Sequence, residues 1–172
     1  MDFTHHPASH AARSLQILLL AIATAGCSTS QFVTDTAPRS TVSRNEAIAL
    51  AKHVAASIDG QVYAVAPTGS MLPTLDDGSI VAVEKVPLDR LQKGDIVIYR
   101  NAAGIAVIHR LYECHGDRWF VLGDRNASID RETVSSCNLL GRVCAIFYTS
   151  GGSPFTGQAV PAPQVTALAS AY

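Results

Sequence analysis

The sequence has little charge and no basic cluster. Only 16% of its 172 residues are charged, and 13 lysines and arginines stand against 14 acidic residues, which leaves a formal net charge of −1. No block of lysine and arginine is present that could neutralise nucleic-acid phosphates, so we expect no nucleic-acid partner. The length suits one compact domain with its own core and leaves little room for a second. Composition and length give no indication of the oligomeric state.

A long hydrophobic run is also missing near the N-terminus. The apolar stretch from Leu15 to Gly26 has twelve residues, whereas a membrane-spanning helix needs about 20. Twelve residues are typical of the hydrophobic region of a signal peptide, so residues 1–26 are expected to form a signal peptide or a short membrane anchor. The rest of the chain is then exported.

Small residues precede a cysteine at the end of this stretch. The segment Ala23-Thr24-Ala25-Gly26-Cys27 resembles the lipobox of bacterial lipoproteins, in which the cysteine is lipidated and becomes the new N-terminus. The pattern favours lipidation of Cys27, and the alternatives are an ordinary signal peptide or an uncleaved anchor. Each case predicts a protein on the exported face of a bacterial cell envelope, and a lipid or an anchor would hold it at the membrane.

Cysteines are few in the remainder. Cys114, Cys137 and Cys144 allow at most one internal disulfide, which export would permit. The pairing stays open, and a reduced, buried cysteine is the alternative at each position. The spacing of these residues and His115 is not that of a zinc site. We expect neither a metal nor an organic cofactor.

A change in pattern at Ser43 marks the start of the folded domain. Residues 27–42 are rich in Ser, Thr and Pro and are expected to be a tether. Ser43 and Glu46 form a capping box, and apolar residues at helical spacing predict one helix over about residues 44–58. Residues 43–150 form the predicted domain, and residues 151–172, rich in Gly, Pro and Ala, are expected to be a flexible tail.

Strand patterns fill the domain after Gly60. β-Branched and aromatic segments bounded by turn residues predict six strands, and no βαβ alternation appears. The predicted fold is therefore mainly β with one N-terminal helix, as a curved antiparallel sheet or small barrel. The predicted strands are Gln61–Ala66, Ser79–Val86, Asp95–Arg100, Ile105–Glu113, Arg118–Leu122 and Leu140–Tyr148.

A loop between the first two predicted strands carries a candidate nucleophile. In Ala66-Pro67-Thr68-Gly69-Ser70-Met71-Leu72-Pro73-Thr74, the glycine allows close approach of a substrate and the second proline restrains the loop. A simple turn is the alternative. The segment resembles the nucleophile box of type I signal peptidases, serine proteases of the same broad class as LexA-like autoproteases. The resemblance implies that Ser70 attacks the peptide bond and that Thr68 helps to bind the oxyanion.

The segment Val107-Ile108-His109-Arg110-Leu111 supplies a candidate base. A serine hydroxyl needs a base at neutral pH, and an imidazole, with an ordinary pKa near 6.5, can take its proton. A histidine with a purely structural role in the strand is the alternative. The only lysines are Lys52, Lys85 and Lys93, and none stands at the lysine position of bacterial signal peptidases. The pair His109-Arg110 resembles the Ser-His branch found in archaea and the endoplasmic reticulum.

An acidic segment after the fifth predicted strand completes the resemblance. Gly123-Asp124-Arg125-Asn126 and the later Asp130 are similar to the Gly-Asp-Asn box of signal peptidases, although Arg125 precedes the asparagine. An Asx-rich turn is the alternative. The resemblance implies that Asp130 orients the imidazole and that Asp124 shapes the site.

The three segments together cover about residues 61–148 in the family's order and imply a fold of the signal peptidase type. The implied activity is cleavage of exported polypeptides after small residues, with the substrate extended along a sheet edge. Three alternatives stay open. They are a catalytically inactive, peptide-binding lipoprotein of the same fold, a self-cleaving regulator of the LexA-like class, and a structural envelope lipoprotein.

Overall fold

The computed structural model describes residues 36–151 and 165–167 of the chain. Helix α1 (Arg44–Ser57) begins after Ser43, whose hydroxyl accepts the Glu46 amide at 3.3 Å while the Glu46 carboxylate accepts the Ser43 amide at 3.0 Å. The predicted capping box is thus confirmed, and the helix ends one residue before its predicted end. Residues 1–26, Cys27 and most of the expected tether lie outside the described residues.

The strands form one antiparallel sheet, which confirms the predicted fold class. The sheet is open, with the order β6-β5-β4-β3-β7-β2-β1-β8. All six predicted strands are present with small shifts of their ends, and a 3₁₀ turn (Leu88–Arg90) precedes β3. The strands are β1 (Gln61–Val65), β2 (Ile80–Glu84), β3 (Ile96–Arg100), β4 (Ala106–His115), β5 (Arg118–Leu122), β6 (Thr133–Val134), β7 (Leu139–Tyr148) and β8 (Val165–Ala167).

The two edge strands of this sheet, β6 and β8, were not expected from the sequence. β6 has two residues, too few to show a periodic pattern. β8 pairs antiparallel with β1, with Val165 opposite Val65 and Ala167 opposite Tyr63. It lies within the segment expected to be a flexible tail, and that expectation did not include a strand.

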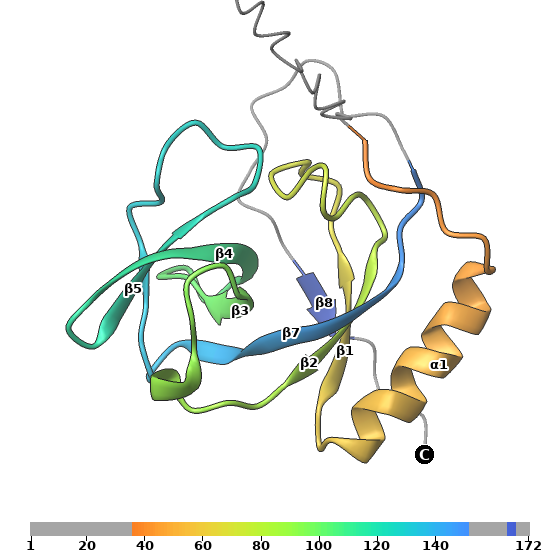
Figure 1. The fold of residues 1–172 in the computed structure, drawn as a ribbon, viewed down its shortest axis with the longest axis horizontal. Coiled ribbons are helices and arrows are strands. Elements are labelled where there is room, and N and C mark those ends of the chain that lie inside the picture. Colours follow the sequence, from red (N-terminus) through yellow and green to blue (C-terminus); the bar gives the residue numbers. More distant parts are fainter. Residues whose placement is uncertain (1–35, 152–164, 168–172) are drawn as a thin grey trace, which may run out of the picture. The chain divides into compact units, whose positions relative to one another are not determined.

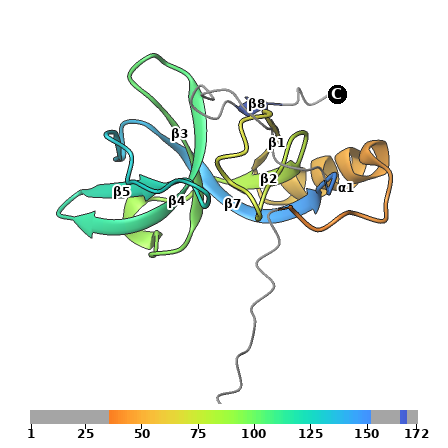
Figure 2. The ribbon, with the colours of Figure 1, turned by 90° about the horizontal axis from the view of Figure 1, so that it is seen from above.

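The buried apolar side chains of the domain form three groups. Helix α1 packs its alanine face, Ala47, Ala51 and Ala55, against β1, β2 and β7. A second group lies between β1, β2 and β3, and a third lies between β3, β4, β5 and β6. The long strand β7 connects the two ends of the sheet (Figure 1), and the β4–β5 hairpin lies at the end opposite α1 (Figure 2).

The cysteines of the domain form no disulfide in the described part of the chain. Cys114, Cys137 and Cys144 are all free and exposed. The alternative of reduced cysteines therefore holds, but the expectation that they are buried does not, because all three lie at the surface. In residues 36–151 and 165–167, no helix has both the length and the apolar character needed to cross a membrane.

Candidate active site

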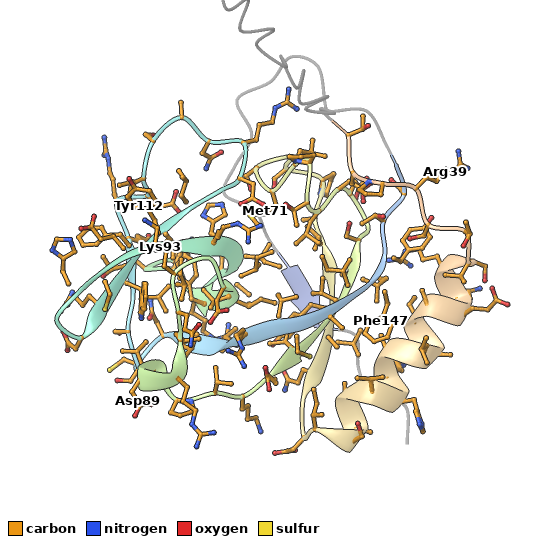
Figure 3. All side chains as sticks on the ribbon, viewed as in Figure 1. Arg39, Met71, Asp89, Lys93, Tyr112 and Phe147 are labelled. Carbon is orange, nitrogen blue, oxygen red and sulfur yellow. The ribbon has the colours of Figure 1, made fainter. Side chains whose placement is uncertain are left out.

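Ser70 lies in the loop that joins β1 to β2. Apolar side chains on its C-terminal side hold this loop on the core, since Met71 and Leu75 are each 1% exposed; Met71 is labelled in Figure 3. Gly69 adopts a φ of +69°, a conformation that residues with a Cβ rarely take. The serine itself stays partly exposed. Core packing on one side and a glycine turn on the other therefore present the hydroxyl at the surface.

His109 lies in the middle of β4 and is 2% exposed. Its ring nitrogen Nε2 lies 3.2 Å from the Ser70 Oγ, within hydrogen-bond distance. Its other nitrogen, Nδ1, forms a hydrogen bond and ion pair with the Asp130 Oδ2. Ser70, His109 and Asp130 come from two loops and one strand, and they form a continuous hydrogen-bonded series.

Asp130 occupies the loop after β5. Its backbone amide donates to the Val121 carbonyl at 3.0 Å, which anchors the residue at the end of that strand. Its side chain is 20% exposed, so the carboxylate lies against the buried imidazole but keeps some contact with solvent. A carboxylate at the Nδ1 side selects the tautomer in which Nε2 has a free lone pair that can accept a proton.

Thr68 also lies near the serine. Its Oγ1 is 3.5 Å from the Ser70 Oγ, at the limit of a hydrogen bond. Its side chain thus stands at the same surface as the serine hydroxyl. A donor at this place is suited to an oxygen that becomes negatively charged next to the serine.

Asp124 is not part of the hydrogen-bonded series. Its carboxylate accepts two bonds of 2.7 Å from the Arg110 guanidinium, at Nε and Nη2, and a third bond from the Thr74 hydroxyl. Hydrogen bonding to Asp124 raises the pKa of Arg110. Arg110 also donates to the Gly94 carbonyl at 2.7 Å. This network ties the strand that carries His109 to the loop that carries Ser70.

Direct backbone contact joins the two loops of the site. The Arg125 amide donates to the Ser70 carbonyl at 2.8 Å. A Cβ atom at Gly123 would lie 2.8 Å from that same carbonyl oxygen and 2.8 Å from the Asn126 Nδ2, which is closer than real Cβ contacts. Glycine at position 123 is therefore a condition for the loops to meet.

One residue of the site was missed by the sequence analysis. Tyr99 on β3 is 2% exposed, and its hydroxyl donates to the Asp130 Oδ2 at 3.1 Å. A pocket of about 240 Å³ opens beside Tyr99, His109 and Asp130. The tyrosine directly follows the apolar residues Ile96, Val97 and Ile98 on β3, so it resembles an ordinary core position in the sequence.

Comparison with protein families assigns the chain to one family. The model of the peptidase S24-like family matches residues 23–144, which is more than half of the sequence. The chain belongs to the peptidase S24-like family. Ser70, His109 and Asp130 all lie inside the matched region.

A curated protein is similar to part of this peptidase S24-like chain. Signal peptidase I W of Bacillus subtilis (strain 168) is 35% identical over an alignment of 77 residues, and this alignment covers 42% of this chain and 40% of that protein. The matched region thus spans less than half of the relative's length. No solved structure is significantly similar to the chain.

Proposed function

We propose that this peptidase S24-like protein is a serine endopeptidase of the signal peptidase type, with Ser70 as nucleophile and His109 as general base. The observation that carries the proposal is the hydrogen-bonded series from the Ser70 Oγ through both imidazole nitrogens to the Asp130 carboxylate. A serine with an adjacent base, itself oriented by a third group, is the arrangement that activates a hydroxyl for acyl transfer.

The geometry supports a two-step reaction. His109 Nε2 takes the Ser70 proton as the Oγ attacks the scissile carbonyl, and the resulting imidazolium is stabilised by Asp130. The imidazolium then gives this proton to the leaving amine, and an acyl-serine remains. Water attacks the acyl-serine with the same imidazole as base, which releases the carboxylate product and restores the serine hydroxyl.

The negative oxygen of each tetrahedral intermediate needs donors near Ser70. We assign one to the Thr68 hydroxyl, 3.5 Å from the Ser70 Oγ before substrate binds. Contacts of this kind tighten when the intermediate forms. Asp124 acts at a distance in this scheme, because its pair with Arg110 holds the two sides of the site together.

The proposed substrate is an exported polypeptide in extended form, cleaved after small residues. The outer edge of β1 supports this class of substrate, because β8 of the same chain pairs with it in register over residues 63–65. An edge that accepts one extended segment can accept another by the same backbone hydrogen bonds. β1 leads directly into the Ser70 loop, and β8 also contacts β4, the strand of His109. A substrate on this edge would displace β8.

The proposed location is the exported side of a bacterial membrane. The support lies in the sequence, where a short apolar stretch, Leu15 to Gly26, ends at Cys27. Lipidation of Cys27 would hold the peptidase next to substrates that are themselves membrane-bound as they emerge. A short anchor without lipid would have the same effect.

Cleavage of an exported substrate with small residues before the scissile bond tests the proposal. Membranes containing the full-length protein are compared with membranes containing Ser70→Ala or His109→Ala at equal abundance. Both substitutions are expected to abolish cleavage, whereas the control His53→Ala, at an exposed position on α1, should match the wild type.

Three results would contradict the proposal. Cleavage that is independent of Ser70 would exclude the serine mechanism, and cleavage by His109→Ala at the wild-type rate would exclude histidine as the base. Equal inactivity of wild type and variants towards several exported substrates would favour the peptide-binding lipoprotein instead.

A further inference from the structure

The hydroxyl of Tyr99 contacts the same carboxylate oxygen as the imidazole. Tyr99 Oη donates to the Asp130 Oδ2 at 3.1 Å, and the His109 Nδ1 binds that same Oδ2. Two donors from neighbouring strands, β3 and β4, thus converge on one oxygen atom of a loop residue. A carboxylate held by two donors has less freedom to rotate than one held by the imidazole alone.

Backbone pairing places the tyrosine on the correct side of the sheet. Val97 of β3 lies opposite His109 of β4, and Tyr99 lies opposite Val107. Residues two apart on a strand point to the same face, so Tyr99 and His109 project from the same face as diagonal neighbours. The ring of Tyr99 is buried in the apolar group that includes Val97 and Val107. Its hydroxyl therefore reaches Asp130 from a rigid platform.

The phenol of Tyr99 is a hydrogen-bond donor in this position. Burial raises the pKa of Tyr99 above its ordinary value, and the negative charge of Asp130 raises it further, with a smaller contribution from Glu132. His109 and Arg131 are the other ionisable side chains that line the same pocket. With its pKa raised, the hydroxyl keeps its proton near neutral pH and serves Asp130 as a donor.

We propose that Tyr99 is a positioning residue, whose hydroxyl holds the Asp130 carboxylate in the orientation that accepts the hydrogen bond from the His109 Nδ1–H. Tyr99 acts on the reaction through Asp130, because its hydroxyl donates to the Asp130 carboxylate. The inference rests on the proposed function for its effect on rate. Its effect on the imidazole, however, exists in the resting protein and can be measured without a substrate.

A simpler role for the hydroxyl predicts different behaviour. If the bond to Asp130 served only to satisfy a buried polar group, its loss would change stability and leave the imidazole as it was. If it positions Asp130, its loss changes the hydrogen bond at His109 Nδ1. The two roles also differ in a double-mutant cycle, because positioning through Asp130 requires that Tyr99→Phe has no effect once Asp130 is alanine.

The experiment compares Tyr99→Phe with Tyr148→Phe in the full-length protein. Tyr148 is the control, because it lies at the end of β7, packs against the apolar group beneath α1, and belongs neither to the hydrogen-bonded series nor to the β1 edge. The first measurement is the downfield proton resonance of His109 Nδ1–H, assigned by its absence in His109→Ala. The second is kcat and KM on the cleaved substrate, in the wild-type and Asp130→Ala backgrounds.

Tyr99→Phe is expected to move or broaden the His109 resonance and to lower kcat by about three- to tenfold, the size of one typical intramolecular hydrogen bond, with KM within about twofold. Tyr148→Phe should change neither the resonance nor the kinetic constants. In the Asp130→Ala background, Tyr99→Phe should change kcat by less than about twofold. Circular dichroism of each variant is the control for folding.

The outcomes separate this inference from the proposed function. An unchanged resonance and kcat in Tyr99→Phe, with cleavage still dependent on Ser70, would overturn the role of Tyr99 and leave the peptidase intact. A fall in kcat of equal size in both backgrounds would also overturn it. A resonance that moves only in Tyr99→Phe, in a protein that cleaves no substrate, would support the positioning of Asp130 and count against the peptidase activity.

Discussion

The nucleophile loop, residues 66–79, and the acid loop, residues 123–132, meet at the site but are held by different forces. In the nucleophile loop Met71, Leu72 and Leu75 are at most 3% exposed and belong to the core. The acid loop has one buried residue, Gly123, and exposes Ile129 by 42%. Its contacts with the rest of the domain are hydrogen bonds and ion pairs.

A buried carboxylate in the nucleophile loop is a second difference between the two loops. Asp76 of the nucleophile loop is 5% exposed and accepts hydrogen bonds from the Ser79 hydroxyl at 2.6 Å and the Gly151 amide at 2.7 Å. It joins the loop to the segment after β7. The position of the nucleophile is thus tied to the stability of the whole domain, while the position of the acid depends on a few polar contacts. Changes in the two loops should affect different properties.

The largest effect is expected from Asp130→Asn in the acid loop. This change keeps the size of the side chain but removes its charge, so His109 loses the partner that selects its tautomer and stabilises the imidazolium. We expect kcat to fall about 10³- to 10⁴-fold, with little change in the free energy of unfolding. Asp117→Asn, whose side chain is 90% exposed in the β4–β5 turn, is the control and should retain full activity. Activity of Asp130→Asn within tenfold of the wild type would remove Asp130 from the proposed mechanism.

The next effect concerns stability and lies in the nucleophile loop. Leu75→Ala should lower the free energy of unfolding by about 2–5 kcal/mol, because it leaves a cavity under the loop. Ile129→Ala in the acid loop should lower it by no more than about 0.5 kcal/mol, since that side chain is largely in solvent. Urea denaturation of both variants measures the difference. Equal losses of stability would show that the two loops are held alike, and the contrast between them would fail.

The smallest effect is expected at β8, the strand that occupies the edge of β1. In Thr166→Pro the proline removes a backbone amide and disfavours strand pairing. The edge is then more often free for substrate, so KM should fall and kcat/KM should rise by about two- to tenfold. Thr166→Val keeps the amide and should behave as the wild type. An unchanged or lower kcat/KM in Thr166→Pro would mean that substrate does not compete with β8.

Local patterns in the sequence predicted most of the fold. The capping box at Ser43, the six longer strands and the antiparallel class were all readable, because turn residues and β-branched runs act over a few positions. The two short edge strands could not be predicted, because two or three residues have no periodicity of their own. They pair only because a neighbouring edge is present. The same limit applied to Cys114 and Cys144, whose exposure depends on which face of their strands is covered.

The register of the β3–β4 hairpin was beyond the sequence. The predicted strand ends, paired directly, would set Arg100 opposite Ile105 and His109 opposite Ile96. In the structure Arg100 lies opposite Ala106, and the Asn101 side chain accepts the Ile105 amide at 2.9 Å within the loop. A shift of one residue moves every side chain to the other face. Tyr99 shares a face with His109 only in the observed register.

The amino-acid sequence by itself determined the chemistry available at the site. Ser70, His109 and two candidate aspartates stood in recognisable segments, since each segment is a short, local pattern. The resemblance already implied different roles for the two aspartates, and the tertiary structure gives their contacts, Asp130 with the imidazole and Asp124 with Arg110. Only the tertiary structure added Tyr99. These contacts join residues 14 to 31 positions apart. Their distances depend on strand register and loop packing, which arise from the burial of the whole sheet and are not encoded in any one segment.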